Sequence, residues 1–277
     1  MRVAVAQMNS TPDVAANLAA VTRLVTEAQT WQAKLLVLPE CFAYLGPESG
    51  REAVAEKLPT GGPILHHCQT LAADTQMELI LGGFWEQSSV ASQCYNACLH
   101  LAQDGQVNAI YRKIHLFDAD LPDGTTLRES DGVIAGDTPT VASTAMGPMG
   151  LSICYDVRFP ELYRHYAQAG AMAAAIPAAF TLTTGKDHWH VLMRARAIEN
   201  QMYILAAAQY GHHFGQRVSY GHALIVNPWG TILAQCSQPE GVAVAEINAM
   251  QLEAVRESLP CLNHRRLDVR HPDAKKA

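Results

Sequence analysis

The stretch GLSICYDVRFPELYR, residues 150–164, is the most informative part of the chain. Its apolar beginning predicts a buried strand over residues 150–156, and Pro160 suits the first turn of a helix over residues 160–168. Polar residues that follow a strand in an α/β protein lie where such folds bind ligands. The chain has seven cysteines, and free cysteines are mostly buried core residues. The question is therefore whether Cys154 belongs to the core or is a nucleophile.

Strands and helices alternate on both sides of this stretch, which predicts an α/β fold. Turns at residues 103–106 and 227–230 predict two antiparallel hairpins, so the sheets are expected to be mixed. No linker or short repeat divides the chain, and we expect one domain over residues 1–277, with a core to about residue 267 and a short polar tail. The other strands are expected over residues 3–7, 34–40, 78–86, 94–102, 107–113, 171–179, 203–209, the two arms of 219–236, and 242–247. The other helices are expected from a cap at Thr11 or Asp13 to about residue 32, and over residues 62–75, 186–202 and 248–259.

Composition excludes several classes of partner. The formal net charge is −6 and the sequence has no basic block, which argues against nucleic acid or an anionic membrane as the main partner. No apolar run reaches the roughly 18 residues that a membrane span needs. The seven cysteines are odd in number and scattered, which is typical of a reducing compartment, so we expect a cytoplasmic protein.

Three reactive side chains follow apolar runs that predict buried strands: Glu40, Lys113 and Cys154. A buried carboxylate or ammonium is costly unless it is paired, so the three are expected to lie together. A thiol needs a base or a cation beside it to act as a nucleophile. Glu40, with a pKa raised by burial, could take the thiol proton and pass it to a leaving amine. Lys113 could stabilise the thiolate and an oxyanion.

Three segments carry a family resemblance: LVLPE at residues 36–40, YRKIHLFD at residues 111–118 and ICYDVRFPE at residues 153–161. They resemble, in order, the signature regions of the nitrilase superfamily of carbon–nitrogen hydrolases. The resemblance implies a four-layer α-β-β-α sandwich with mixed sheets that forms a homodimer or a higher homo-oligomer. It also implies catalysis by a glutamate, a lysine and a cysteine, with no metal and no cofactor. The matching positions are Glu40, Lys113 and Cys154.

The same resemblance assigns two supporting groups. A second glutamate that faces the lysine is common in the family, and Glu129 lies at the corresponding place in a long irregular segment, residues 114–135. Such segments are often functional. The backbone N–H of Tyr155, the residue after the cysteine, is implied as an oxyanion donor.

Finer features, among them SYGHALIVNPWG and LPCLNHRRLD, look most like the deaminated glutathione amidase branch. That branch implies hydrolysis of a small 2-oxo acid amide to 2-oxoglutarate and cysteinylglycine through a thioester of the cysteine. Four alternatives stay open: an ω-amidase acting on 2-oxoglutaramate or 2-oxosuccinamate, a carbamoyl-amine amidohydrolase, a nitrilase, and an inactive scaffold of the same fold.

Three further residues are candidates for substrate binding. Arg158 could form a salt bridge with Asp156 or meet a substrate carboxylate, for which a guanidinium is well shaped. Phe180 and Trp189 could line the pocket, and ordinary packing is the equal alternative. The twelve histidines form no paired metal-binding motif, so no metal site is expected.

Overall fold

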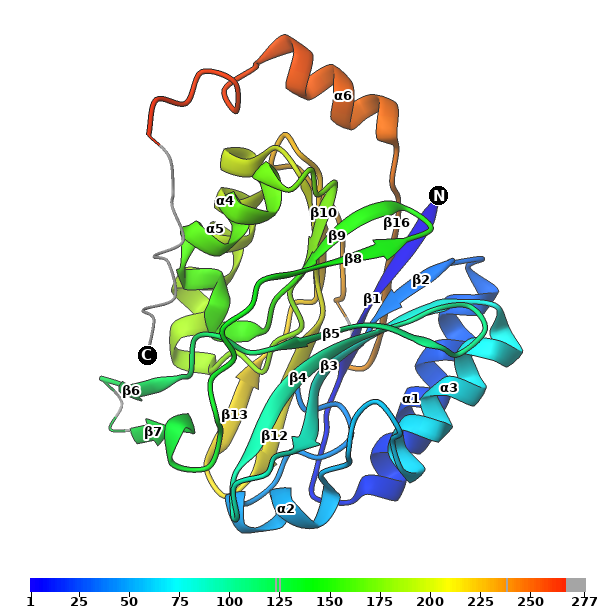
Figure 1. Ribbon diagram of the computed structural model, residues 1–277, viewed down its shortest axis with the longest axis vertical. Helices are drawn as coiled ribbons and strands as arrows, with labels where there is room; N and C mark the ends of the chain where they lie inside the picture. Colours follow the sequence, from blue (N-terminus) through cyan, green and yellow to red (C-terminus); the bar gives the residue numbers. More distant parts are fainter. Residues whose placement is uncertain (123, 125, 238, 268–277) are drawn as a thin grey trace.

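The computed structural model describes residues 1–122, 124, 126–237 and 239–267 (Figure 1). The predicted polar tail, residues 268–277, lies outside the described residues. None of the helices in the described part of the chain is long and apolar enough to cross a membrane.

The strands are β1 (Arg2–Met8), β2 (Leu35–Val37), β3 (Glu78–Gln87), β4 (Cys94–Leu101), β5 (Val107–Arg112), β6 (Asp118–Asp120), β7 (Thr126–Arg128), β8 (Thr140–Thr144), β9 (Gly147–Leu151), β10 (Ala173–Ala175), β11 (Tyr203–Ala206), β12 (Ala208–Phe214), β13 (Arg217–Tyr220), β14 (Leu224–Val226), β15 (Ile232–Gln235) and β16 (Gly241–Glu246). The α-helices are α1 (Val14–Thr30), α2 (Arg51–Val54), α3 (Pro63–Thr75), α4 (Pro160–Gln168), α5 (Leu182–Asn200) and α6 (Ala249–Ser258). Short 3₁₀ helices are η1 (Glu48–Gly50), η2 (Glu129–Asp131) and η3 (Cys154–Arg158).

Two mixed sheets form the centre of the molecule. The larger has the strand order β13-β12-β1-β2-β3-β4-β5, and β16 also pairs with β1; the smaller has the order β15-β14-β11-β10-β9-β8. Parallel pairs such as β1–β2 and β9–β10 occur beside antiparallel pairs such as β3–β4 and β14–β15. The hairpins expected at residues 103–106 and 227–230 are both present.

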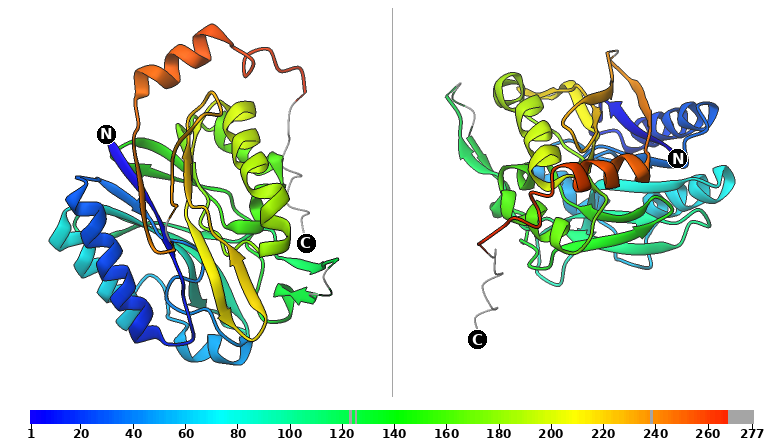
Figure 2. Two further views of the ribbon diagram at one scale, coloured as in Figure 1. Left: turned by 180° about the vertical axis from the view of Figure 1, so that it is seen from behind. Right: turned by 90° about the horizontal axis from the view of Figure 1, so that it is seen from above.

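Alternation along the central strands builds the layers. Val5 of β1 belongs to the core shared with Leu151 of β9, whereas its neighbour Ala6 belongs to a second core with Leu24 of α1. Successive residues of a strand face opposite sides of a sheet, so β1 contributes to both cores. Helices α1 and α3 cover the outer side of the larger sheet, and α4 and α5 cover the smaller one (Figures 1 and 2). The expected α-β-β-α sandwich with mixed sheets is confirmed.

Some element boundaries follow the sequence closely and others do not. Helix α4 has the predicted bounds, and Asp13 caps α1 by accepting a hydrogen bond from the Ala16 N–H at 3.0 Å. Helix α5 begins four residues earlier than predicted, at Leu182. The segment 114–135 is largely irregular as expected but contains the β6–β7 pair and η2.

The strand predicted over residues 150–156 is wrong in its second half. β9 ends at Leu151, and Cys154 opens η3 with φ +47°. A left-handed backbone cannot continue a strand, so the chain turns sharply at Cys154.

Candidate active site

Glu40 is a buried carboxylate that follows the end of β2 and is held by three donors. Its Oε1 accepts hydrogen bonds from the Lys113 Nζ and the Asn96 Nδ2, each at 3.0 Å. Its Oε2 accepts the Ala179 N–H at 2.9 Å. Asn96 lies on β4 and Lys113 directly follows β5, both in the larger sheet. Ala179 lies in the segment that follows β10 of the smaller sheet. Groups from both sheets therefore fix one carboxylate.

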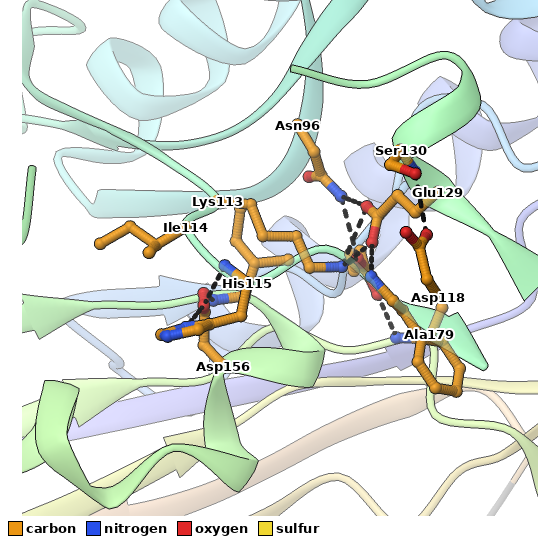
Figure 3. Close-up of polar contacts among 12 residues, drawn as sticks. Asn96, Lys113, Ile114, His115, Asp118, Glu129, Ser130, Asp156 and Ala179 are labelled. Carbon is orange, nitrogen blue, oxygen red and sulfur yellow. Dashed lines mark hydrogen bonds and ion pairs between the residues drawn. The ribbon is translucent and has the colours of Figure 1, made fainter. Parts of the chain in front are cut away.

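Lys113 is the first residue after β5 and is 2% exposed. Its ammonium lies between two carboxylates: 3.0 Å from the Glu40 Oε1 and 2.7 Å from the Glu129 Oε2 (Figure 3). Glu129 also accepts the Phe117 N–H at 2.7 Å, which fixes the irregular segment against the site. Paired in this way, a buried cation keeps its charge.

Asn96 on β4 completes this network and was missed by the sequence analysis. Its Nδ2 donates to Glu40 and to Glu129, each at 3.0 Å. The residue is 1% exposed, and a buried amide in an otherwise apolar strand needs polar partners. The asparagine within CYNACLHLA was the available signal, since it alternates with buried apolar residues.

A bulge in β3 makes room for Glu40. The pairing of β3 with β4 shifts register between Leu81 and Phe84, and Gly83 lies there with φ +61°. A Cβ on Gly83 would lie 2.3 Å from the Cys41 backbone nitrogen and 2.7 Å from the Glu40 Cγ. Only glycine allows this approach, so Gly83 sets how closely the Glu40 segment packs on the strand.

Cys154 lies at the sharp turn after β9, 5% exposed, and its own N–H donates to the Pro177 carbonyl oxygen at 2.9 Å. Its thiol lies close enough to the Glu40 carboxylate for each group to shift the pKa of the other. A non-glycine residue with positive φ is a strained conformation of the kind found at functional sites. Tyr155 follows in the first turn of η3, where helix geometry leaves N–H groups without an intrahelical acceptor.

Asp156 holds this turn in place and does not pair with Arg158. Its Oδ2 accepts the Tyr111 hydroxyl and the Ile153 N–H, both at 2.8 Å, and its Oδ1 contacts the His115 Nδ1 at 2.7 Å. The carboxyl group thereby connects η3 to the end of β5 and the residues after it (Figure 3). Of the two alternatives for Arg158, the salt bridge with Asp156 is therefore wrong.

The electrostatics of the three reactive groups correct one expectation. Burial opposes ionisation of Glu40, but the Lys113 ammonium and the hydrogen bonds from Cys154 and Ala179 hold the pKa of Glu40 below its ordinary value. The expected raised pKa of Glu40 is wrong because the Lys113 charge and the hydrogen bonds to the carboxylate together outweigh burial, the largest single influence.

The other two reactive groups are shifted upward. Burial favours the neutral amine of Lys113, but the Glu129 and Glu40 carboxylates raise the pKa of Lys113 well above its ordinary value. Burial, together with the Glu40 charge, raises the pKa of the Cys154 thiol well above the usual range. The resting site therefore holds a carboxylate, an ammonium and a neutral thiol.

A cavity of about 120 Å³, open to solvent, has Glu40, Lys113, Glu129 and Cys154 on its wall. These four predicted residues are therefore together. The arrangement places a thiol, a proton acceptor and a cation where a small molecule can enter, which suits nucleophilic chemistry at a carbonyl group.

A smaller cavity of about 10 Å³ also borders Cys154 and is lined by Tyr155, Arg158 and Phe180 among others. The Arg158 guanidinium lies 5.1 Å from the centre of the Phe180 ring. Trp189 lines neither cavity: it is fully buried behind Phe180, 5.3 Å between ring centres, and donates to the His222 carbonyl oxygen. The expectation that Trp189 contacts substrate is wrong, because its ring belongs to the core.

Within the described residues, no group of three or more His, Cys, Asp or Glu side chains is arranged to hold a metal ion.

Comparisons with known proteins agree with this arrangement. The model of the carbon–nitrogen hydrolase family matches residues 2–257. Deaminated glutathione amidase of Synechocystis sp. (strain PCC 6803 / GT-S) is 45% identical over 262 residues, which cover 94% of this chain and 96% of that protein. The protein of the same name from Homo sapiens is 42% identical over 274 residues, covering 96% and 83%. The crystal structure of Saccharomyces cerevisiae Nit3, a member of branch 10 of the nitrilase superfamily, has a TM-score of 0.84 at 31% identity and covers 96% of this chain and 97% of its own.

Proposed function

The chain belongs to the carbon–nitrogen hydrolase family, and we propose that it is a thiol amidase that hydrolyses deaminated glutathione to 2-oxoglutarate and cysteinylglycine. The observation that carries the proposal is the hydrogen-bonded set of Glu40, Lys113 and Glu129 beside the Cys154 thiol, on the wall of one open cavity. Relatives at 42–45% identity that carry the name deaminated glutathione amidase support the choice of substrate.

In the first half of the proposed reaction the Cys154 sulfur attacks the amide carbonyl carbon while the thiol proton passes to Glu40. The lowered pKa keeps Glu40 ionised and able to accept this proton, but it also makes the carboxylate a weaker base, and the pKa of the Cys154 thiol is raised. The transfer therefore accompanies the attack of sulfur on the carbonyl carbon and does not precede it. Lys113 and the Tyr155 N–H stabilise the oxyanion of the tetrahedral intermediate. Glu40 then donates the proton to the nitrogen, the C–N bond breaks, and the amine leaves behind a thioester.

In the second half Glu40 takes a proton from water as the oxygen attacks the thioester carbonyl. The C–S bond breaks, the proton returns to the sulfur and the acid leaves. Glu129 is proposed to hold Lys113 charged and in place throughout, since its carboxylate is the nearest acceptor of that ammonium, at 2.7 Å.

The carboxylate end of the acyl part of the substrate is proposed to point toward the smaller cavity, where Arg158 can meet the carboxylate of a 2-oxo acid over the Phe180 ring. The leaving group then extends into the larger cavity. This division favours an amide with a sizeable leaving group over an ω-amidase substrate such as 2-oxoglutaramate, which releases only ammonia.

The test is a comparison of Cys154→Ser and Cys154→Ala with the wild type on deaminated glutathione and on 2-oxoglutaramate. We expect both variants to fold and to lose turnover, and we expect the wild type to prefer deaminated glutathione. Turnover by Cys154→Ala would refute the thiol mechanism. An equal or higher kcat/KM for 2-oxoglutaramate would identify an ω-amidase instead.

We also propose a cytoplasmic homo-oligomer, most simply a homodimer. All seven cysteines are free thiols, which fits a reducing compartment. Val191 and Ile198 of α5 and the nearby Trp229 are exposed apolar side chains, which a second copy could bury. Light scattering after size exclusion gives the mass in solution, and a monomeric mass at micromolar concentration would reject the oligomer.

A further inference from the structure

Two arginines of the larger cavity have no part in the proposed reaction. Arg51 opens α2 and Arg217 opens β13, so elements far apart in the sequence bring two guanidinium groups to one wall. Neither lines the smaller cavity that holds Arg158. The larger cavity therefore carries positive charge beyond Lys113, on the side proposed for the leaving group.

Arg217 is incompletely paired. Its Nη2 donates to the Ala179 carbonyl oxygen at 3.2 Å, while its Nε is buried and finds no acceptor within the described residues. No carboxylate in the described part of the chain forms a salt bridge with it. The Ala179 N–H donates to Glu40, so the Arg217 side chain is one residue away from the reacting groups.

Arg51 repeats the pattern. Its Nη2 contacts the half-exposed Glu48 at 3.1 Å, and its guanidinium lies 4.8 Å from the centre of the Trp85 ring. Its Nη1 is buried and, among the described residues, has no hydrogen-bond acceptor. The Arg51 charge is close enough to Cys41, next to Glu40, to act on that thiol.

A third arginine of the same wall shows the contrast. The Nη2 of Arg128 contacts both carboxylate oxygens of Asp120 at 2.8 Å, so its charge is already paired. A guanidinium has five N–H donors, and a buried N–H without an acceptor is unfavourable. Arg51 and Arg217 therefore each have a buried N–H for which the fold supplies no acceptor. An anionic ligand in the cavity would supply one.

We propose that Arg51 and Arg217 form a subsite for a carboxylate at the far end of the leaving group, so that the enzyme selects amides of 2-oxo diacids whose amine part is an anionic dipeptide. The inference rests on the proposed function and deepens it. The aromatic residues Trp85, Phe117 and Phe214 line the same cavity and provide apolar surface for the body of the dipeptide. Ammonia, the leaving group of an ω-amidase, gains nothing from this subsite.

The experiment measures kcat/KM of wild type, Arg217→Gln and Arg51→Gln on three substrates: deaminated glutathione, its C-terminal amide, and 2-oxoglutaramate. The amide keeps the size of the leaving group and removes only the charge. We expect wild type to prefer the acid over the amide, and each variant to reduce that preference by about 10- to 100-fold, the worth of one hydrogen bond between charged groups. Arg128→Gln is the matched control, and its preference for the acid should equal that of wild type.

Three outcomes are informative. If Arg217→Gln loses activity equally on acid and amide, Arg217 only positions Ala179 and Glu40, and the subsite is rejected while the proposed function stands. If wild type does not hydrolyse deaminated glutathione, the proposed function and the subsite fall together. Arg217→Lys guards against a folding defect, because it keeps the charge and should recover part of the preference for the acid; failure of that recovery in a folded variant also counts against the subsite.

Discussion

Two buried carboxyl groups near Cys154, those of Glu40 and Asp156, have different surroundings and therefore different roles. Glu40 faces the open cavity and contacts the Lys113 ammonium. Asp156 is fully buried, lines neither cavity, and accepts hydrogen bonds from a tyrosine hydroxyl and backbone N–H groups. Both belong to the motifs that marked the site in the sequence. Contact with a cation and access to the cavity, not burial, distinguish the group suited to proton transfer.

The largest expected effect comes from removing the carboxylate of Glu40. Glu40→Gln keeps an acceptor for Lys113 but cannot take the Cys154 proton, so kcat should fall by about 10²- to 10⁴-fold. Steady-state assays measure the loss, and circular dichroism checks that the variant is folded. A folded variant with near-normal kcat would show that Glu40 is as structural as Asp156.

A smaller effect should follow from Glu129→Gln, which leaves Glu40 in place and removes the second negative charge at Lys113. The Lys113 ammonium is then less favoured, so its pKa falls. In the wild type, activity that depends on this charge should persist beyond pH 10.5, the ordinary value, and in the variant it should be lost at lower pH. A kcat/KM profile with the same alkaline limb in both proteins would remove Glu129 from its supporting role.

Asp156→Asn should affect stability more than chemistry. One of its oxygens becomes an NH₂ group that faces the donors around it, so the free energy of unfolding should fall by about 1–3 kcal/mol. Tyr111→Phe removes one of these donors together with the acceptor of the Ile114 N–H, and should cost about 0.5–1.5 kcal/mol. Urea denaturation measures both. If Asp156→Asn lost as much turnover as Glu40→Gln at unchanged stability, the contrast between the two carboxyl groups would not hold.

The smallest effect concerns pH in the wild type. Because the pKa of Glu40 is lowered, its charged form contributes stability above the ordinary value of 4.5, and this contribution is lost only as pH falls through the lowered value. The kcat/KM profile should therefore show no acidic limb above pH 5 from this group. An acidic limb near pH 6 that Glu40→Gln abolishes would mean that burial outweighs the Lys113 charge and the hydrogen bonds together.

The alternation of strands and helices predicted the α/β class, and the resemblance to the nitrilase superfamily implied the four layers. The main reactive residues were predicted because each left a strong local signal. Glu40, Lys113 and Cys154 are polar residues that follow buried apolar runs, and burial of such groups requires partners. Asn96 gave a weaker signal, since one polar residue in a strand usually reaches solvent. Arg51 and Arg217 gave no signal in the sequence. They line the same cavity only because β13 and the segment before α3 fold around the site.

Two errors have the same origin. The strand was predicted through Cys154 because the run of apolar residues continues, but the left-handed turn there is a property of the whole site and not of local propensity. The pKa of Glu40 was expected to rise because only its burial was considered. Its shift depends on the charge of Lys113, which follows β5 and lies 73 residues away in the sequence.

The bulge at Gly83 has a consequence for anyone who transplants or redesigns this site. A scan for activity should find Gly83 as intolerant as a reacting residue, although Gly83 lines neither cavity at Cys154. On another sandwich scaffold without that bulge, the Glu40 segment could not pack this closely, because a Cβ at the position of Gly83 would lie 2.3 Å from the Cys41 backbone nitrogen. A transplanted site therefore has to include a glycine at the position of residue 83, because a side chain there would clash with the Glu40 segment.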